Sequence, residues 1–145
     1  MKRVSKKPVD EQKVEPSEPV VSIENLEVKF INQDATVYAV NGVDIKLERG
    51  KVLTILGESG SGKSVTMRSI LRLLPPKASL SGSIIVDGEN VIEMSQDQLS
   101  NMRGRDVSMI FQEPMVAFDP VYKVGYQIAE TVVRHLGSSF EDALA

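Results

Sequence analysis

Residues Gly57 to Ser64 read G-E-S-G-S-G-K-S, a complete G-x-x-x-x-G-K-[ST] pattern. The apolar run 52–56 precedes this stretch, and a helix-like segment begins at Ser64. Glycines in such a turn leave successive backbone N–H groups bare, and the following helix directs the positive end of its dipole at the same point. The pattern therefore predicts a strand, loop and helix that together bind the phosphates of a nucleoside triphosphate.

Each residue type of this loop has a physical role. Glycine has no side chain to separate a backbone amide from a phosphate. The Lys63 ammonium is suited to clamping the β- and γ-phosphates, and the Ser64 hydroxyl to ligating Mg²⁺, a hard ion that prefers oxygen. The alternative, a Gly/Ser-rich turn before a helix, requires neither group at these offsets. The residues expected to contact the nucleotide here are Gly57, Glu58, Ser59, Gly60, Ser61, Gly62, Lys63, Ser64 and Val65.

The composition is that of an ordinary globular protein, with 145 residues, 41% hydrophobic and 26% charged. This length suffices for one domain with a core. The net charge of −3 gives no basic footprint for nucleic acid, so nucleic-acid partners are disfavoured. Because cysteine is absent, disulfides and thiolate metal sites are excluded.

Alternating apolar residues predict an antiparallel hairpin ahead of the loop. Residues 1–19 are rich in charge and proline, which predicts a disordered leader. The run Val20–Phe30 alternates with one slip near Asn25, which indicates a half-buried strand with a bulge. After a turn at 32–34, the run Val37–Leu47 alternates again and completes the hairpin.

Two further apolar runs, 52–56 and 107–111, are expected to be buried strands. A helix is expected over 64–74, where Pro75-Pro76 would end it. The other expected elements are a strand over 83–86 that ends in an Asp87-Gly88 turn, a helix over 96–102 capped by Ser95, and a helix over 127–135 with His135 facing solvent.

Several of these features together resemble the ATP-binding subunit of ABC transporters, in particular that of peptide importers. The resemblance covers about 20–130, and its most specific part is M-I-F-Q-E-P-M at Met109–Met115. The segments Phe118-Asp119-Pro120, Val124–Ile128 and Glu130 continue it. It implies an α/β P-loop NTPase fold over 20–145, the N-terminal part of an ABC-type ATP-binding domain with an antiparallel β subdomain.

The resemblance also assigns roles outside the loop. Gln112 occupies the position of a glutamine that reaches Mg²⁺ and the attacking water, and it begins the segment that contacts the membrane subunit. A neutral amide suits that role because it binds metal and water without adding charge. For stacking on adenine, Phe30 matches the family position better than Tyr38 does. The implied cofactors are ATP and Mg²⁺.

Three motifs of the resembled family are missing. No strand of four apolar residues followed by Asp-Glu comes after Gln112, and no L-S-G-G-Q or switch histidine occurs. Leu80–Ser83 only begins like the signature, and Asp87 is assigned to a turn because Gly88 follows it. The chain is therefore expected to be an N-terminal part that ends before the signature motif and the acid strand, and to hydrolyse ATP poorly by itself.

The resemblance implies a place on the cytoplasmic side of the plasma membrane, peripherally bound. The implied partners are membrane-spanning permease subunits and a second ATP-binding subunit that forms a dimer sandwich in the parent protein. Two alternatives remain open at this point. One is a free-standing P-loop kinase or GTPase, which the long antiparallel lead-in disfavours, and the other is a nucleotide-binding module without hydrolysis.

Overall fold

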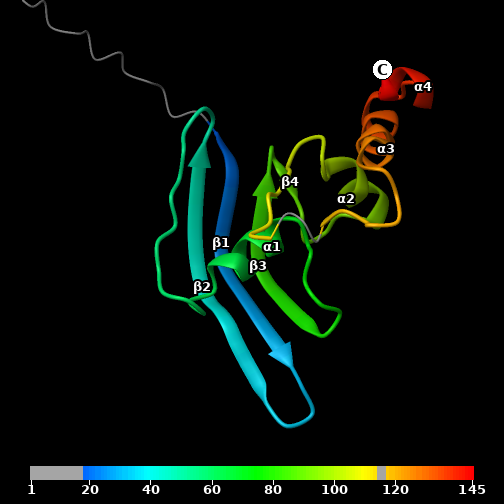
Figure 1. Ribbon diagram of the computed structural model, residues 1–145. Coiled ribbons are helices and arrows are strands. Elements are labelled where there is room, and N and C mark those ends of the chain that lie inside the picture. Colours follow the sequence, from blue (N-terminus) through cyan, green and yellow to red (C-terminus); the bar gives the residue numbers. More distant parts are fainter. Residues whose placement is uncertain (1–17, 114–116) are drawn as a thin grey trace, which may run out of the picture.

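The computed structural model describes residues 18–113 and 117–145 of the chain. Its sheet is four-stranded and antiparallel, with the strand order β2-β1-β3-β4 (Figure 1). The strands are β1 (Pro19–Ile31), β2 (Thr36–Glu48), β3 (Ala78–Val86) and β4 (Glu89–Asn90). The helices are α1 (Lys63–Ile70), α2 (Gln96–Met102), α3 (Val124–Leu136) and α4 (Phe140–Leu144). The α1 helix contacts β1 and β2, whereas α3 and α4 lie beyond α2, away from the hairpin (Figure 1).

The predicted hairpin is confirmed, including its bulge. β1 pairs with β2, and the register shifts between Ile23 and Leu26. At the bulge Asn25 has a φ of 47°, and its N–H donates to Asp44 Oδ1 at 2.7 Å. Asparagine tolerates this left-handed conformation better than most residues, which explains why the slip falls there. The strand begins at Pro19, one residue inside the predicted leader, while 1–17 lie outside the described residues.

The core lies between the sheet and the segments that follow it. Ile23, Leu26, Val28 and Ile84 are fully buried on the sheet. Residues from the end of α1, from the segment between β4 and α2, and from α2 belong to the same core, namely Leu71, Val91, Met94, Leu99 and Met102. Burial of this apolar surface holds α1 and α2 against the sheet.

The two predicted buried strands are absent from this structure. No strand forms over 52–56, and Val52 and Leu56 are 95% and 87% exposed. The run 107–111 forms only one isolated bridge, from Val107 to Arg103, and Ile110 is 92% exposed. The prediction was wrong here because strand propensity depends on neighbouring strands that pair and pack, and within the described residues neither run has such a partner.

Several other local predictions are confirmed. The α2 helix has the predicted bounds, and a capping box closes its start. The Gln98 N–H donates to Ser95 Oγ at 3.3 Å, and the Ser95 N–H donates to Gln98 Oε1 at 2.9 Å. The turn between β3 and β4 holds Asp87 and Gly88, both with positive φ, as two-residue hairpin turns favour.

Two helix predictions need correction. The α1 helix ends at Ile70, four residues before the predicted end, because the chain turns at Arg72 with a φ of 48°. His135 is half-buried rather than solvent-facing, since its ring lies against the backbone of Gly104. In residues 18–113 and 117–145, none of the helices combines the length and apolarity needed to span a bilayer.

The structure explains why position 82, in the L-S-G-S stretch, is a glycine. Its φ is +94°, and an added Cβ would lie 2.3 Å from the Asn25 carbonyl oxygen at the bulge. We expect Gly82→Ala to lower the free energy of unfolding by about 2–4 kcal/mol, because backbone strain and a clash with main-chain atoms add. Urea unfolding followed by circular dichroism measures this change.

Gly88→Ala is the matched control for Gly82→Ala. Gly88 has a similar φ of +84°, but an added Cβ would meet nothing within 4 Å. We expect a loss of only about 1–2 kcal/mol from the left-handed backbone. Equal losses in the two variants would contradict a close approach of β3 to the bulge.

Candidate functional site

The Lys63 ammonium lies inside the predicted phosphate loop. It donates hydrogen bonds to the carbonyl oxygens of Gly57 at 2.7 Å and Glu58 at 2.5 Å, and to Ser61 Oγ at 3.1 Å. The ammonium therefore binds oxygens from the start of the loop and from its middle, so the loop folds around one positive charge. Hydrogen bonds from a charged donor are stronger than neutral ones, so this contact can hold a glycine-rich turn in one conformation.

The α1 helix begins at Lys63 with its first turn open. Its N-cap is Gly62, in a left-handed conformation with a φ of 89°, and no side chain caps the first N–H groups. The first turn carries no acidic residue. The first N–H groups of a helix have no partner within the helix, and the helix dipole adds partial positive charge at this end. The positive end of α1 is thus left uncapped by side chains where it meets the loop.

The loop packs against β2 at a second bulge. The register between β1 and β2 shifts after Val28, so Ala39 lies unpaired between Tyr38 and Val40. An added Cβ on Gly62 would lie 2.5 Å from the Ala39 carbonyl oxygen and 3.4 Å from the Val40 side chain. Backbone therefore meets backbone at this point, and only glycine fits. Ala39 carries no sequence signal for this role, so its contact with Gly62 could not be predicted from the sequence.

A cavity of about 330 Å³ opens at the loop. Gln112 reaches it from a distant part of the chain, so the structure brings together the two predicted parts of the site. The lining residues are Ala39, Ser59, Gly60, Ser61, Gly62, Lys63, Ser64, Val65 and Gln112. The Ser64 hydroxyl and the Gln112 amide oxygen are the oxygen donors predicted for Mg²⁺. Gly57 and Glu58 instead contribute their carbonyl oxygens to Lys63.

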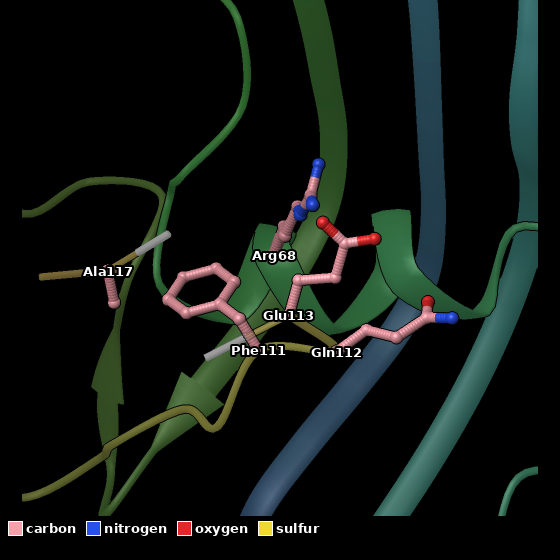
Figure 2. A pocket seen from close by; sticks show the side chains of 5 residues that line it. All are labelled: Arg68, Phe111, Gln112, Glu113 and Ala117. Carbon is pink, nitrogen blue, oxygen red and sulfur yellow. The ribbon is translucent and has the colours of Figure 1, made fainter. Parts of the chain in front are cut away.

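Gln112 also lines a neighbouring cavity of about 460 Å³ with Arg68, Phe111, Glu113 and Ala117. Figure 2 shows the Gln112 amide extending away from the Phe111 ring, which points toward Ala117. Phe111 is 37% exposed, although it belongs to the run 107–111 that was expected to be a buried strand. Pro114 and Met115 of the Q-E-P-M run lie outside the described residues.

Neither candidate adenine-stacking residue lines the loop cavity. Phe30 is half-buried and packs against the core. Tyr38 is 61% exposed and lies opposite Lys29, whose ammonium is 5.1 Å from the ring centre. A hydrogen bond with Glu27 raises the pKa of Lys29, so this ammonium stays charged. The two aromatic rings lie on opposite faces of the sheet, because adjacent strand residues point to opposite sides.

The fold and the loop define an α/β domain of the P-loop NTPase class, here with an antiparallel β subdomain. A family model described as ABC transporter matches residues 40–143. The chain therefore belongs to the ABC transporter family.

Relatives and solved structures agree with this family. The glutathione import ATP-binding protein GsiA of Salmonella typhi is 43% identical over 136 residues, which is 89% of this chain and 22% of GsiA. The dipeptide transport ATP-binding protein DppD of Bacillus subtilis is 43% identical over 120 residues, which is 81% of this chain and 36% of DppD. The chain thus spans about a fifth to a third of the length of these curated relatives.

Among solved structures, the dimeric bacterial ABC transporter cassette MJ0796 has a TM-score of 0.73 at 21% identity. The match covers 86% of this chain and 52% of the cassette. A structure of the same cassette in a post-hydrolysis state, bound to ADP and Pi, has a TM-score of 0.69. At this level of identity the likeness concerns the fold, and it confirms the predicted fold class.

The contact between loop and hairpin can be tested with Gly62→Ala. The added methyl group would press on the Ala39 carbonyl oxygen, so the loop has to move off β2. We expect the free energy of unfolding to fall by about 1–3 kcal/mol more than in Gly60→Ala, whose φ of +81° is similar but whose Cβ would meet nothing within 4 Å. Urea unfolding of the two variants and the parent chain checks this, and equal losses would contradict the contact.

Proposed function

We propose that this chain binds ATP with Mg²⁺ at the loop cavity, as the nucleotide-binding part of an ABC transporter subunit that powers peptide import. One observation carries the proposal. The Lys63 ammonium and the uncapped start of α1 meet at one cavity, which is lined by the loop and by Gln112. Positive charge and free N–H donors at one concave point suit a triphosphate.

The loop residues would bind and orient the phosphates. Lys63 already donates to loop oxygens, and it can turn toward a phosphate while the glycine backbone stays close. The N–H groups of Lys63, Ser64 and Val65 at the start of α1 would donate to phosphate oxygens, because no side chain occupies them. These contacts bind anions without selecting the base.

The oxygen donors at the cavity fit Mg²⁺. Ser64 supplies a hydroxyl and Gln112 an amide oxygen, and both line the same cavity. Mg²⁺ keeps several waters and takes few protein ligands, so two neutral oxygens beside the phosphates are a suitable set. When bound, Mg²⁺ would neutralise charge on the phosphate oxygens. Gln112 would also orient a water molecule at the open side of the cavity.

The strand register supports Phe30 over Tyr38 as the residue that stacks on adenine. Val28 pairs with Val40, which lies against Gly62, so this face of the sheet carries the loop. Phe30 is two residues after Val28 and lies on the same face. Tyr38 pairs with Lys29 and lies on the opposite face. A base on the loop face can therefore meet Phe30 and not Tyr38.

The parent protein would be a peripheral subunit on the cytoplasmic side of the plasma membrane. It would contact membrane-spanning permease subunits and pair with a second ATP-binding subunit. The similarity to GsiA and DppD supports glutathione or short peptides as the imported class, and the dimeric MJ0796 cassette supports the paired arrangement. Membership of the ABC transporter family disfavours the kinase and GTPase alternatives.

Lys63→Ala tests the central contact. The substitution removes the cation from the loop, so we expect ATP affinity to fall by about 3 kcal/mol, roughly a hundredfold. Isothermal titration calorimetry with MgATP measures the loss. Lys51→Ala removes the same charge from an exposed position outside the cavity and should leave affinity unchanged. Unchanged binding by Lys63→Ala would remove the proposed function.

Phe30→Leu and Tyr38→Leu test base stacking. We expect Phe30→Leu to weaken MgATP binding by about 1–2 kcal/mol, because an aromatic face is lost while the position stays apolar. Binding of inorganic tripolyphosphate, which has no base, should not change. Tyr38→Leu should bind both ligands like the parent chain. A larger loss of ATP affinity in Tyr38→Leu would assign the stacking to the opposite face of the sheet.

A further inference from the structure

The α1 helix ends in a hydrogen-bonded turn with a left-handed residue after its C-cap. The Leu73 N–H donates to the Arg68 carbonyl at 2.9 Å, and the Arg72 N–H donates to the Ser69 carbonyl at 3.0 Å. This is a Schellman motif, in which glycine normally occupies the left-handed position. Here Arg72 occupies it, with a φ of 48°. A residue other than glycine at such a position costs about 1–2 kcal/mol, so another contact must hold it there.

That contact comes from the Arg72 guanidinium. It donates to the Met94 carbonyl at 2.6 Å and lies 3.4 Å from the Val91 carbonyl. The side chain thus ties the end of α1 to the segment between β4 and α2. A guanidinium has several donors in a fixed plane and suits contacts with backbone oxygens of this kind.

Arg103 makes the reciprocal contact. Its Nε and Nη2 donate to the Leu71 carbonyl at 2.9 and 2.6 Å, and Nη2 also lies 3.3 Å from the Arg72 carbonyl. Carbonyls at the end of a helix have no partner within the helix, and the dipole makes this end negative. Arg103 therefore caps α1 from outside, while its own backbone forms the C-cap of α2.

From Arg103 the chain leads directly to Gln112. Arg103 forms an isolated bridge with Val107, and both Val107 and Met109 pack against the core. Three residues after Met109, Gln112 reaches the loop cavity. The other wall of this cavity is the first turn of α1. The two walls are thus joined at the far end of α1 by Arg103, about one helix length from the cavity.

We propose that Arg103 is a positioning residue that sets Gln112 relative to the first turn of α1. This inference rests on the proposed function, because Gln112 has a role only if the cavity holds MgATP. Without the Arg103 contacts, the 103–112 segment and α1 would each remain packed on the core. Their positions relative to one another would no longer be fixed by hydrogen bonds. Ser64 and Gln112 would then no longer face the metal at a fixed spacing.

The nucleotide test uses Arg103→Met, which keeps an unbranched stem without donors. We expect MgATP affinity to fall about three- to tenfold, while affinity for ATP in EDTA stays unchanged. The reason is that only metal binding depends on the position of Gln112 relative to Ser64. With Gln112→Ala already present, Arg103→Met should cause no further loss. Equal losses with and without Mg²⁺, full additivity with Gln112→Ala, or no loss would each overturn the proposal.

Arg105→Met is the matched control. Arg105 lies in the same turn, is exposed, and bonds both carboxylate oxygens of Asp106 at 2.8 Å instead of α1. That bond lowers the pKa of Asp106, and its loss should not alter MgATP affinity. If Arg103→Met does not fold, Arg103→Lys replaces it, because one ammonium cannot reproduce the fork to Leu71 and Arg72.

Hydrogen exchange in the nucleotide-free chain separates failure of this inference from failure of the proposed function. Arg103→Met should speed amide exchange at the end of α1 and over 104–107 together, because the Gly104, Asp106 and Val107 N–H groups donate to backbone carbonyls there. Arg105→Met should leave exchange at the end of α1 unchanged. If exchange becomes faster in both segments of Arg103→Met but the parent chain binds no ATP, the link between α1 and the 103–112 segment stands. The proposed nucleotide function is then wrong. Exchange that changes in only one of the two segments would overturn the positioning role.

Discussion

The hydrogen bonds of the Lys63 ammonium are the interaction on which the site depends. Three loop oxygens converge on this cation, two of them main-chain carbonyls. A glycine-rich turn has high conformational freedom, and ordering it costs free energy that apolar burial cannot offset on an exposed loop. A charged donor inside the turn supplies the missing stabilisation. The same charge lines the cavity, so the order of the loop and the proposed affinity for an anion have one source.

The loop also needs a surface to rest on, and the hairpin provides it. A bulge in β2 leaves Ala39 unpaired, which brings its carbonyl oxygen against Gly62 at the start of α1. The antiparallel subdomain therefore does more than precede the phosphate loop in sequence. It fixes the start of α1 through backbone contact, and it presents Phe30 on the same face.

The sequence predicted features that depend on neighbouring residues and missed those that depend on distant ones. Ser95 and Gln98 form a capping box within one helical turn, and the bulge near Asn25 follows from the alternation of a single strand. The Ser95 cap and the bulge were both predicted correctly, whereas the part of Gln98 in the capping box was not predicted. The runs 52–56 and 107–111 have the composition of buried strands, yet a strand needs a partner, and within residues 18–113 and 117–145 neither run pairs over its length. Ala39 and Arg103 carried no pattern at all, because their roles arise from tertiary contacts with α1.

The bulges of the long hairpin divide it into sections whose pairings are set separately. Register shifts lie on both sides of Leu26 and again after Val28, so the pairs near the 32–35 turn are not rigidly tied to those near Pro19. A slip in an uninterrupted ladder would invert the side chains along its whole length. Here an insertion or deletion at the tip would be absorbed at the nearest bulge. The tip of the hairpin can thus change in length while the residues beside the phosphate loop keep their orientation.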